Sequence, residues 1–139
     1  MDIRQYLFGT TTRQLVYKSL DAGALRSRVV AQNLANVDTP GYKRKEVSFE
    51  DQLQDLIKKK VPGAQTQEGH LPLGKGVDLS GIQPKVYEAK DPTLPGEINN
   101  VDVDIEAAKM AENQVLYSFA IKWAGFDKLN SAIAGRSMG

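Results

Sequence analysis

Residues 11–36 read TTRQLVYKSLDAGALRSRVVAQNLAN, a stretch without proline and with Gly23 as its single glycine. Apolar or small residues recur in it at alternating steps of four and three, which makes a narrow stripe with a period close to 3.5 residues. The stripe comprises Val16, Leu20, Gly23, Ser27, Val30, Leu34 and Val37. This spacing predicts a helix over residues 12–36, about 37 Å long at 1.5 Å per residue. A helix of that length needs an equally long partner.

The partner is expected near the other end of the chain, where the same spacing returns. Its stripe comprises Val103, Ala107, Met110, Gln114, Tyr117, Ile121 and Ala124. Asn99, Asn100 and Asp102 precede the stripe and are good helix N-caps, and Gly135 ends the pattern after Ala134. Two stripes of matching period predict a mainly α fold, in which two long terminal helices pair antiparallel like a coiled coil. An ordinary helical hairpin core explains the pattern equally well.

Glycine and proline divide the chain into three parts. Residues 61–100 hold eleven of the eighteen Gly and Pro residues, so helix is improbable there. We therefore expect an N-terminal helix, a turn motif and a short helix from Gln52 to Lys60 within residues 1–60. Residues 61–100 form an insert with one or two short strands around Val77 with Leu79 and Val86 with Tyr87, and residues 101–139 form the C-terminal helix that packs on the N-terminal one.

Composition excludes several classes of function. The 139 residues carry 18 basic and 17 acidic side chains, so no strong field draws the chain to nucleic acid or to an anionic membrane surface. There is no cysteine, and His70 is the single histidine, with only Glu68 and Asp78 as nearby acids. No run approaches the roughly 20 apolar residues of a membrane span. We expect a protein that is not an enzyme, holds no metal or cofactor, binds no nucleic acid and is not inserted in a membrane.

The most specific local pattern follows the N-terminal helix. It consists of Ala35, Asn36, Val37, Asp38, Thr39, Pro40, Gly41 and Tyr42. Proline disfavours helical backbone at the residue before it, so the helix must end before Pro40. Pro40 followed by Gly41 suits the two central positions of a type II turn. The pattern predicts a rigid helix stop and a reversal of the chain.

The segment from Ala24 to Tyr42, together with the helix before it, resembles the N-terminal signature of the axial rod and hook proteins of the bacterial flagellum. Two strings nearer the C-terminus, Asn99-Asn100-Val101-Asp102 and Met110-Ala111-Glu112-Asn113-Gln114, resemble more narrowly the proximal-rod family of the flagellar basal body, the rod protein B type. A length near 140 residues and the Gly69-His70-Leu71 context agree with that family. The resemblance covers both termini, about 70 residues.

This resemblance implies a structural subunit that leaves the cytoplasm through the flagellar type III export apparatus without a cleaved signal. The subunit then polymerises into the proximal rod, so its location is the flagellar basal body, in the part of the rod that spans the periplasm. The implied partners are further copies of itself, other rod subunits, basal-body ring and adaptor proteins, and the export gate. In this family the terminal helices form the inner coiled-coil domain of a helical tube and often fold only on assembly.

Two residue sets acquire roles from the resemblance. The first is an assembly seam on the two helical stripes, made of Val16, Leu20, Val30, Leu34, Val103, Met110, Tyr117 and Ile121. The second is an export-gate recognition pattern, a Phe followed four positions later by an apolar residue, which Phe49 and Leu53 match. A short pattern of this kind also fits a phenylalanine that merely packs on the helices.

Three alternatives remain open. The neighbouring rod subunit, of the rod protein C type, shares the N-terminal signature but normally has a different C-terminal string. A soluble helical adaptor or chaperone would bind one partner through its exposed stripe and never polymerise. A nucleic-acid-binding helical protein would use Lys43, Arg44 and Lys45, although Glu46 and Glu50 follow closely with the opposite charge.

Overall fold

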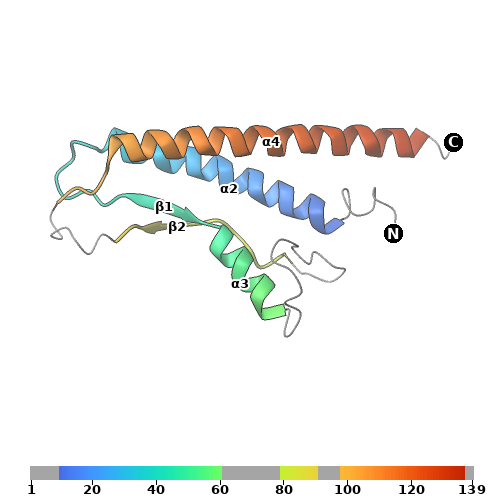
Figure 1. Cartoon of the computed structure of the whole chain (residues 1–139), viewed down its shortest axis with the longest axis horizontal. Helices are drawn as coiled ribbons and strands as arrows, with labels where there is room; N and C mark the ends of the chain where they lie inside the picture. Colours follow the sequence, from blue (N-terminus) through green and yellow to red (C-terminus); the bar gives the residue numbers. More distant parts are fainter. Residues whose placement is uncertain (1–9, 61–78, 91–97, 137–139) are drawn as a thin grey trace.

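A computed structural model describes residues 10–60, 79–90 and 98–136. Its elements, in chain order, are α2 (Thr10–Ala35), β1 (Lys45–Ser48), α3 (Glu50–Lys60), β2 (Lys85–Glu88) and α4 (Val103–Arg136). The two long helices run side by side, and both strands and α3 lie on one side of the pair (Figure 1). The fold is mainly helical, with two long helices and a small two-stranded addition, as the sequence predicts.

Three polar contacts along the pair show that α2 and α4 are antiparallel. Near the start of α2, the Arg13 guanidinium donates to both carboxylate oxygens of Asp127, each at 2.8 Å. Midway, the Asn113 amide donates to the carbonyl of Gly23 at 2.9 Å. Near the end of α2, the Asn33 amide donates to Glu106 at 2.9 Å. The expected antiparallel pairing is therefore confirmed.

The face of α4 that contacts α2 differs from the expected one. Met110, Tyr117 and Ala124 are partly buried, but Val103, Ala107, Gln114 and Ile121 are exposed. The other residues of the contact face each lie one position before a position of the predicted stripe. They are Glu106, Asn113, Ala120 and Asp127. The reason is chemical, because three of these positions are polar residues that hydrogen bond to groups on α2. An apolar period cannot identify a contact made by carboxylates and an amide.

The expected stripe on α2 does lie toward the interior. Gly23 and Val30 are buried, and the remaining members, Val16, Leu20, Ser27, Leu34 and Val37, are partly buried. At Gly23 the two helices come close, since a Cβ atom added there would lie 2.8 Å from Cδ2 of Tyr117. Close approach at a residue without a side chain is a recognised use of glycine.

A small apolar core lies between α2 and α3. Phe49 is buried there with Ala22, Leu79 and Ile82, and Leu15, Leu53 and Leu56 pack against them. Leu79, which the sequence suggested for a strand, belongs instead to this core, whereas Val77 lies outside the described residues. The helix α3 begins at Glu50, two residues before the expected start.

The two-stranded sheet was predicted only in part. Val86 and Tyr87 do lie in a strand, β2, which pairs antiparallel with β1 in the register Lys45 opposite Glu88 through Ser48 opposite Lys85. The pattern of β1, Lys-Glu-Val-Ser, alternates too briefly to indicate a strand. Its pairing comes from contacts that are distant in sequence.

We predict opposite effects of the same substitution at two helical glycines. Gly125→Ala should raise the free energy of unfolding by about 0.5–1 kcal/mol, because alanine favours helix and a Cβ there meets nothing within 4 Å. Gly23→Ala should lower it, because overpacking against Tyr117 costs about 1–3 kcal/mol and exceeds the helical gain. Chemical denaturation of both variants measures the difference. Equal stabilisation by the two changes would contradict the close helix contact.

Candidate functional site: the junction of two sequence motifs

The motif after α2 forms the turn that its sequence predicts. The helix ends at Ala35, and the amide of Asn36 still donates to the carbonyl of Asn33 at 3.1 Å. The amide of Tyr42 donates to the carbonyl of Thr39 at 3.3 Å, which closes a turn with Pro40 and Gly41 at its centre. Gly41 has a φ of 72°, the left-handed value that the third position of a type II turn requires.

Asn99 closes this turn from the far end of the chain. Its side-chain amide donates to the carbonyls of Asn36 and Val37, both at 2.8 Å, and of Thr39 at 2.9 Å. A helix end leaves carbonyl groups without helical partners. The carbonyls of Asn36 and Thr39 also accept from the backbone amides of Thr39 and Tyr42, so Asn99 adds a second donor to these two and supplies the donor to Val37. Asn99 was expected to cap the following helix. That role belongs to Asp102, whose Oδ1 accepts from the amides of Asp104 and Ile105 at 2.9 and 3.2 Å.

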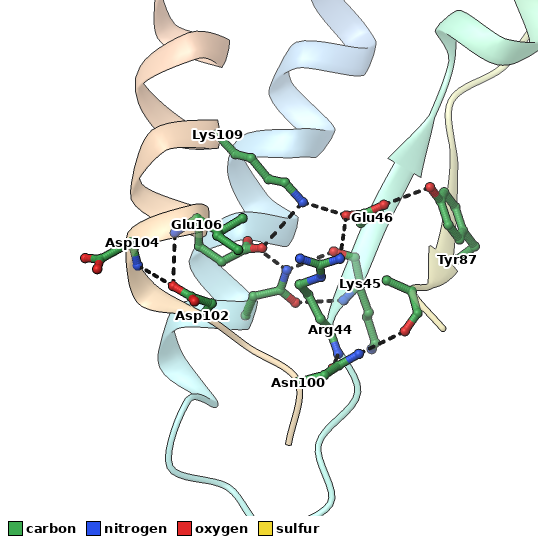
Figure 2. A network of polar contacts seen from close by, with 12 residues as sticks. Arg44, Lys45, Glu46, Tyr87, Asn100, Asp102, Asp104, Glu106 and Lys109 are labelled. Carbon is green, nitrogen blue, oxygen red and sulfur yellow. Dashed lines mark hydrogen bonds and ion pairs between the residues drawn. The ribbon is translucent and has the colours of Figure 1, made fainter. Parts of the chain in front are cut away.

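Asn100 extends the two-stranded sheet by one step. Its Oδ1 accepts from the backbone amide of Arg44 at 2.6 Å, and its Nδ2 donates to the carbonyl of Ala89 at 3.0 Å (Figure 2). Arg44 precedes β1 and Ala89 follows β2, so the side-chain amide bridges the two strands beyond their last pair. Neighbouring asparagines of one motif thus bind two different parts of the chain.

Asn33 is the buried centre of the junction and has no exposed surface. Its Oδ1 accepts from the Lys45 amide at 2.9 Å and from the Tyr42 hydroxyl at 3.1 Å. Its Nδ2 donates to the Lys45 carbonyl at 2.8 Å and to Glu106 at 2.9 Å. One amide therefore binds α2 to the turn, to β1 and to α4, and both of its N–H donors are used.

A chain of charged groups continues from Asn33 toward the sheet. The Glu106 carboxylate, buried on α4, lies 3.8 Å from Nζ of Lys109, which donates to Glu46 on β1 at 2.5 Å (Figure 2). Arg44 lies 3.1 Å from Glu46, and the Tyr87 hydroxyl donates to Glu46 at 2.9 Å. Two strands and α4 are thereby joined through a single carboxylate, Glu46.

The charges within this network shift its titrations. Burial alone would raise the pKa of the Glu46 carboxyl, but the hydrogen bonds from Lys109 and Tyr87 and the nearby cations lower it below its ordinary value. The pKa of the Tyr87 hydroxyl is raised, chiefly because it donates to Glu46. The pKa of Tyr42 is raised by burial and by the charge of Glu106.

The junction serves to position segments of the chain. Among the described residues no group of three or more His, Cys, Asp or Glu side chains could hold a metal ion. Within the same residues, no helix is both long and apolar enough to cross a membrane. The polar groups of the junction bind backbone atoms and one another, so the arrangement holds two distant motifs in register.

The structure brings together some of the residues that the sequence singles out, and separates others. The turn motif and the string from Asn99 to Asp102 meet at the junction, and Phe49 lies apart in the apolar core with 3% of its surface exposed. Sequence reasoning missed the roles of Glu46 and Lys109, because the sequence does not show whether a charged side chain is paired or solvated. Asn33 and Asn100 could be singled out from the sequence because they lie within the segments that carry the family resemblance.

Comparison with known proteins finds relatives that match most of this chain. A family model described as flagella basal body rod protein matches residues 20–43, which run from the second half of α2 through the turn. The flagellar basal body rod protein FlgB of Bacillus subtilis is 30% identical over 133 residues, 93% of this chain and 97% of that protein. The FlgB of Borrelia hermsii is 35% identical over 114 residues (75% and 80%), and that of Borreliella burgdorferi 31% over 105 (73% and 78%).

The chain therefore belongs to the family of flagellar basal body rod proteins, whose role in the flagellum is structural. All three of these relatives are FlgB proteins, which agrees with the narrower resemblance carried by the string from Asn99 to Asp102.

Asn33→Asp should destabilise the fold by about 3 kcal/mol or more at neutral pH. The new carboxylate keeps the shape of the amide but faces Glu106 and the Lys45 carbonyl without a proton to donate. Adding Glu106→Gln should recover part of the loss, because the Gln amide can donate to Asp. Gln32→Glu, the same chemical change one residue earlier at an exposed position, is the control. Equal unfolding free energies for Asn33→Asp and the control would refute the central role of Asn33.

A second prediction concerns acid. Because the folded-state pKa of Glu46 lies below its ordinary 4.5, the carboxylate contributes stability above pH 4.5. That contribution is lost as the pH falls from there through the lower folded pKa. Glu46→Gln should reduce stability at pH 7 and flatten its decline in this acid range. Tyr87→Phe, which removes one donor to Glu46, should be intermediate. Denaturation curves between pH 7 and 3 provide the measurement, and an unchanged acid slope in Glu46→Gln would count against the network.

Proposed function

We propose that this chain is a structural subunit of the proximal rod of the flagellar basal body, exported by the flagellar type III apparatus and polymerised through its terminal helices. One observation carries the proposal. The outer side of α4 is apolar, with Phe119 66% and Phe126 65% exposed, and Leu129 and Ile133 also exposed. A helix that is apolar on the side away from its partner is typical of a protein that packs against further subunits.

The proposed partners follow from the family and from this surface. They are further copies of the chain, other rod subunits, basal-body ring and adaptor proteins, and, during export, the export gate. The proposed location is the rod within the periplasm. Of the residues expected in the assembly seam, Val103 and Ile121 are half exposed and available to a neighbour, whereas Val16, Leu20, Val30, Leu34, Met110 and Tyr117 are buried or partly buried within the chain.

Purified basal bodies test the proposal directly. A label placed at His70, in the segment outside the described residues, should appear at the proximal end of the rod. A label at the adjacent level would favour the rod protein C type of subunit. A non-polymerising adaptor or chaperone would be absent from basal bodies, and its binding to rod proteins would saturate at a fixed stoichiometry.

The export pattern at Phe49 and Leu53 is part of the proposal. Phe49 is buried against Ala22, Leu79 and Ile82, so an export gate can bind it only after this core has opened. The core is small and is made of few residues, which makes such local opening inexpensive relative to global unfolding. Export recognition and loss of the folded core are then coupled steps.

Phe49→Ala should reduce secretion of the subunit if the export gate reads this side chain. Because Phe49 is buried, the change should also destabilise the fold, by about 3–5 kcal/mol. Ile82→Ala is the matched control, since Ile82 is equally buried in the same core but lies outside the pattern. Secretion is measured as the ratio of exported to cytoplasmic protein. A normal ratio for Ile82→Ala with a low ratio for Phe49→Ala supports recognition. Similar ratios for both variants would reduce Phe49 to a packing residue.

A further inference from the structure

A regular stripe on the outer side of α4 was not part of the expected seam. It consists of Val115, Phe119, Lys122, Phe126, Leu129 and Ile133, at alternating steps of four and three. All six residues are exposed, and they lie opposite the face that carries Asn113 and Tyr117. We call these six residues the outer stripe. It is about 27 Å long at 1.5 Å per residue, and its third member, Lys122, is the only charged one.

A cleft on another side of the molecule has the complementary character. It lies between α2, β1 and α4, has a volume of about 360 Å³, and adjoins a second cleft of about 200 Å³ along the helix pair. Val29, Val30, Val47 and Leu116 supply its apolar lining. A cleft of this size accepts side chains rather than a whole helix, so a partner would insert one face of a helix into it.

The charged residues at the cleft indicate what kind of partner it binds. Glu46 and Glu50 already pair with cations, Glu46 with Arg44 and Lys109 and Glu50 with Arg26. Glu112 is exposed at the cleft and, within the described part of the chain, has no ion-pair partner. Lys122 on the outer stripe likewise has none among the residues described. Lys45 also lines the cleft without an ion-pair partner among the described residues, but the lining still holds one more carboxylate than cations, with Glu46, Glu50, Glu106 and Glu112 against Arg26, Lys45 and Lys109. This excess acid matches the unpaired cation Lys122.

The charge on the outer stripe also disfavours a simpler arrangement. In two copies packed stripe against stripe about a two-fold axis through its midpoint, residue 124, Lys122 would face Phe126 and have no carboxylate to pair with. In a parallel arrangement of the two stripes, Lys122 would face Lys122 among apolar side chains. Like charges in apolar surroundings oppose association. A contact between two different surfaces avoids the clash, and such a contact repeats without closing when its rotation does not complete a ring.

We propose that the outer stripe of one copy docks in the cleft of a second copy of this chain, with Lys122 of the first copy paired to Glu112 of the second. The proposal rests on the proposed polymerisation, and it adds the two surfaces and the charge pair that orient them. Each subunit then offers one outer stripe and one cleft, which is the minimum for growth in one direction.

Chemical cross-linking of the full chain tests the pairing. Lys122 and Glu112 are ten residues apart on one helix, about 15 Å, so a zero-length carbodiimide link between them must join two copies. A mixture of ¹⁴N- and ¹⁵N-labelled chains, concentrated until it self-associates, should yield the mixed-isotope Lys122–Glu112 peptide in mass spectrometry. Absence of that peptide, or absence of self-association at any attainable concentration, would overturn the proposal.

Charge reversal tests the energetics. Lys122→Glu and Glu112→Lys should each weaken self-association, measured by sedimentation, roughly tenfold or more, and the double variant should restore it. Lys128→Glu reverses an exposed basic residue of α4 outside the outer stripe and should have no effect. Circular dichroism should show equal helix content in all variants. Failure of the double variant to recover would refute the charge pair.

Incorporation into basal bodies separates this inference from the proposed function. If the wild-type chain enters the rod and Lys122→Glu enters it equally well, the docking surfaces are wrong while the proposed function stands. If the wild-type chain itself is absent from basal bodies, the proposed function fails, whatever the cross-linking shows.

Discussion

The side-chain amide of Asn33 is the interaction on which the rest of the structure depends. It pairs with both backbone polar groups of Lys45, as a neighbouring strand would, and it donates to the buried carboxylate of Glu106. Through this amide, the end of α2 determines where β1 begins and the axial position of α4 relative to α2. A buried amide that satisfies backbone groups and a carboxylate in this way tolerates no shift in register, because any shift leaves a buried polar group without a partner.

Different residues determine the specificity and the closeness of the contact between the two long helices. Specificity comes from the polar contacts at Asn33, Asn113 and Arg13 with their partners, while the close approach comes from Gly23 against Tyr117. Many of the apolar side chains of α4 lie instead on its outer side. In an isolated monomer this distribution would leave apolar surface exposed to water, which the hydrophobic effect disfavours. In a subunit that packs among neighbours it is expected, since the outer side is then covered by other chains.

The two motifs that carry the family resemblance are two halves of one structure. The turn after α2 presents three carbonyls to the far end of the chain, and the side-chain amide of Asn99, about sixty residues away, donates to all three. Asn100 then joins Arg44 to Ala89. Pro40 and Gly41 predict the turn locally, but the roles of Asn99 and Asn100 follow only from the distant groups that they bind.

The sequence by itself determined the elements whose cause is local. The period of the stripe predicts α2 and α4, and Pro40 with Gly41 predicts the turn. The sequence offers Asn99, Asn100 and Asp102 as N-caps of α4, and the structure selects Asp102. Only the tertiary structure decided which face of α4 meets α2, that β1 exists, and that Phe49 is core. Those outcomes depend on partners far away in sequence. A buried Glu106 or Asn113 cannot be distinguished from a solvated one until the group that satisfies its hydrogen bonds is known.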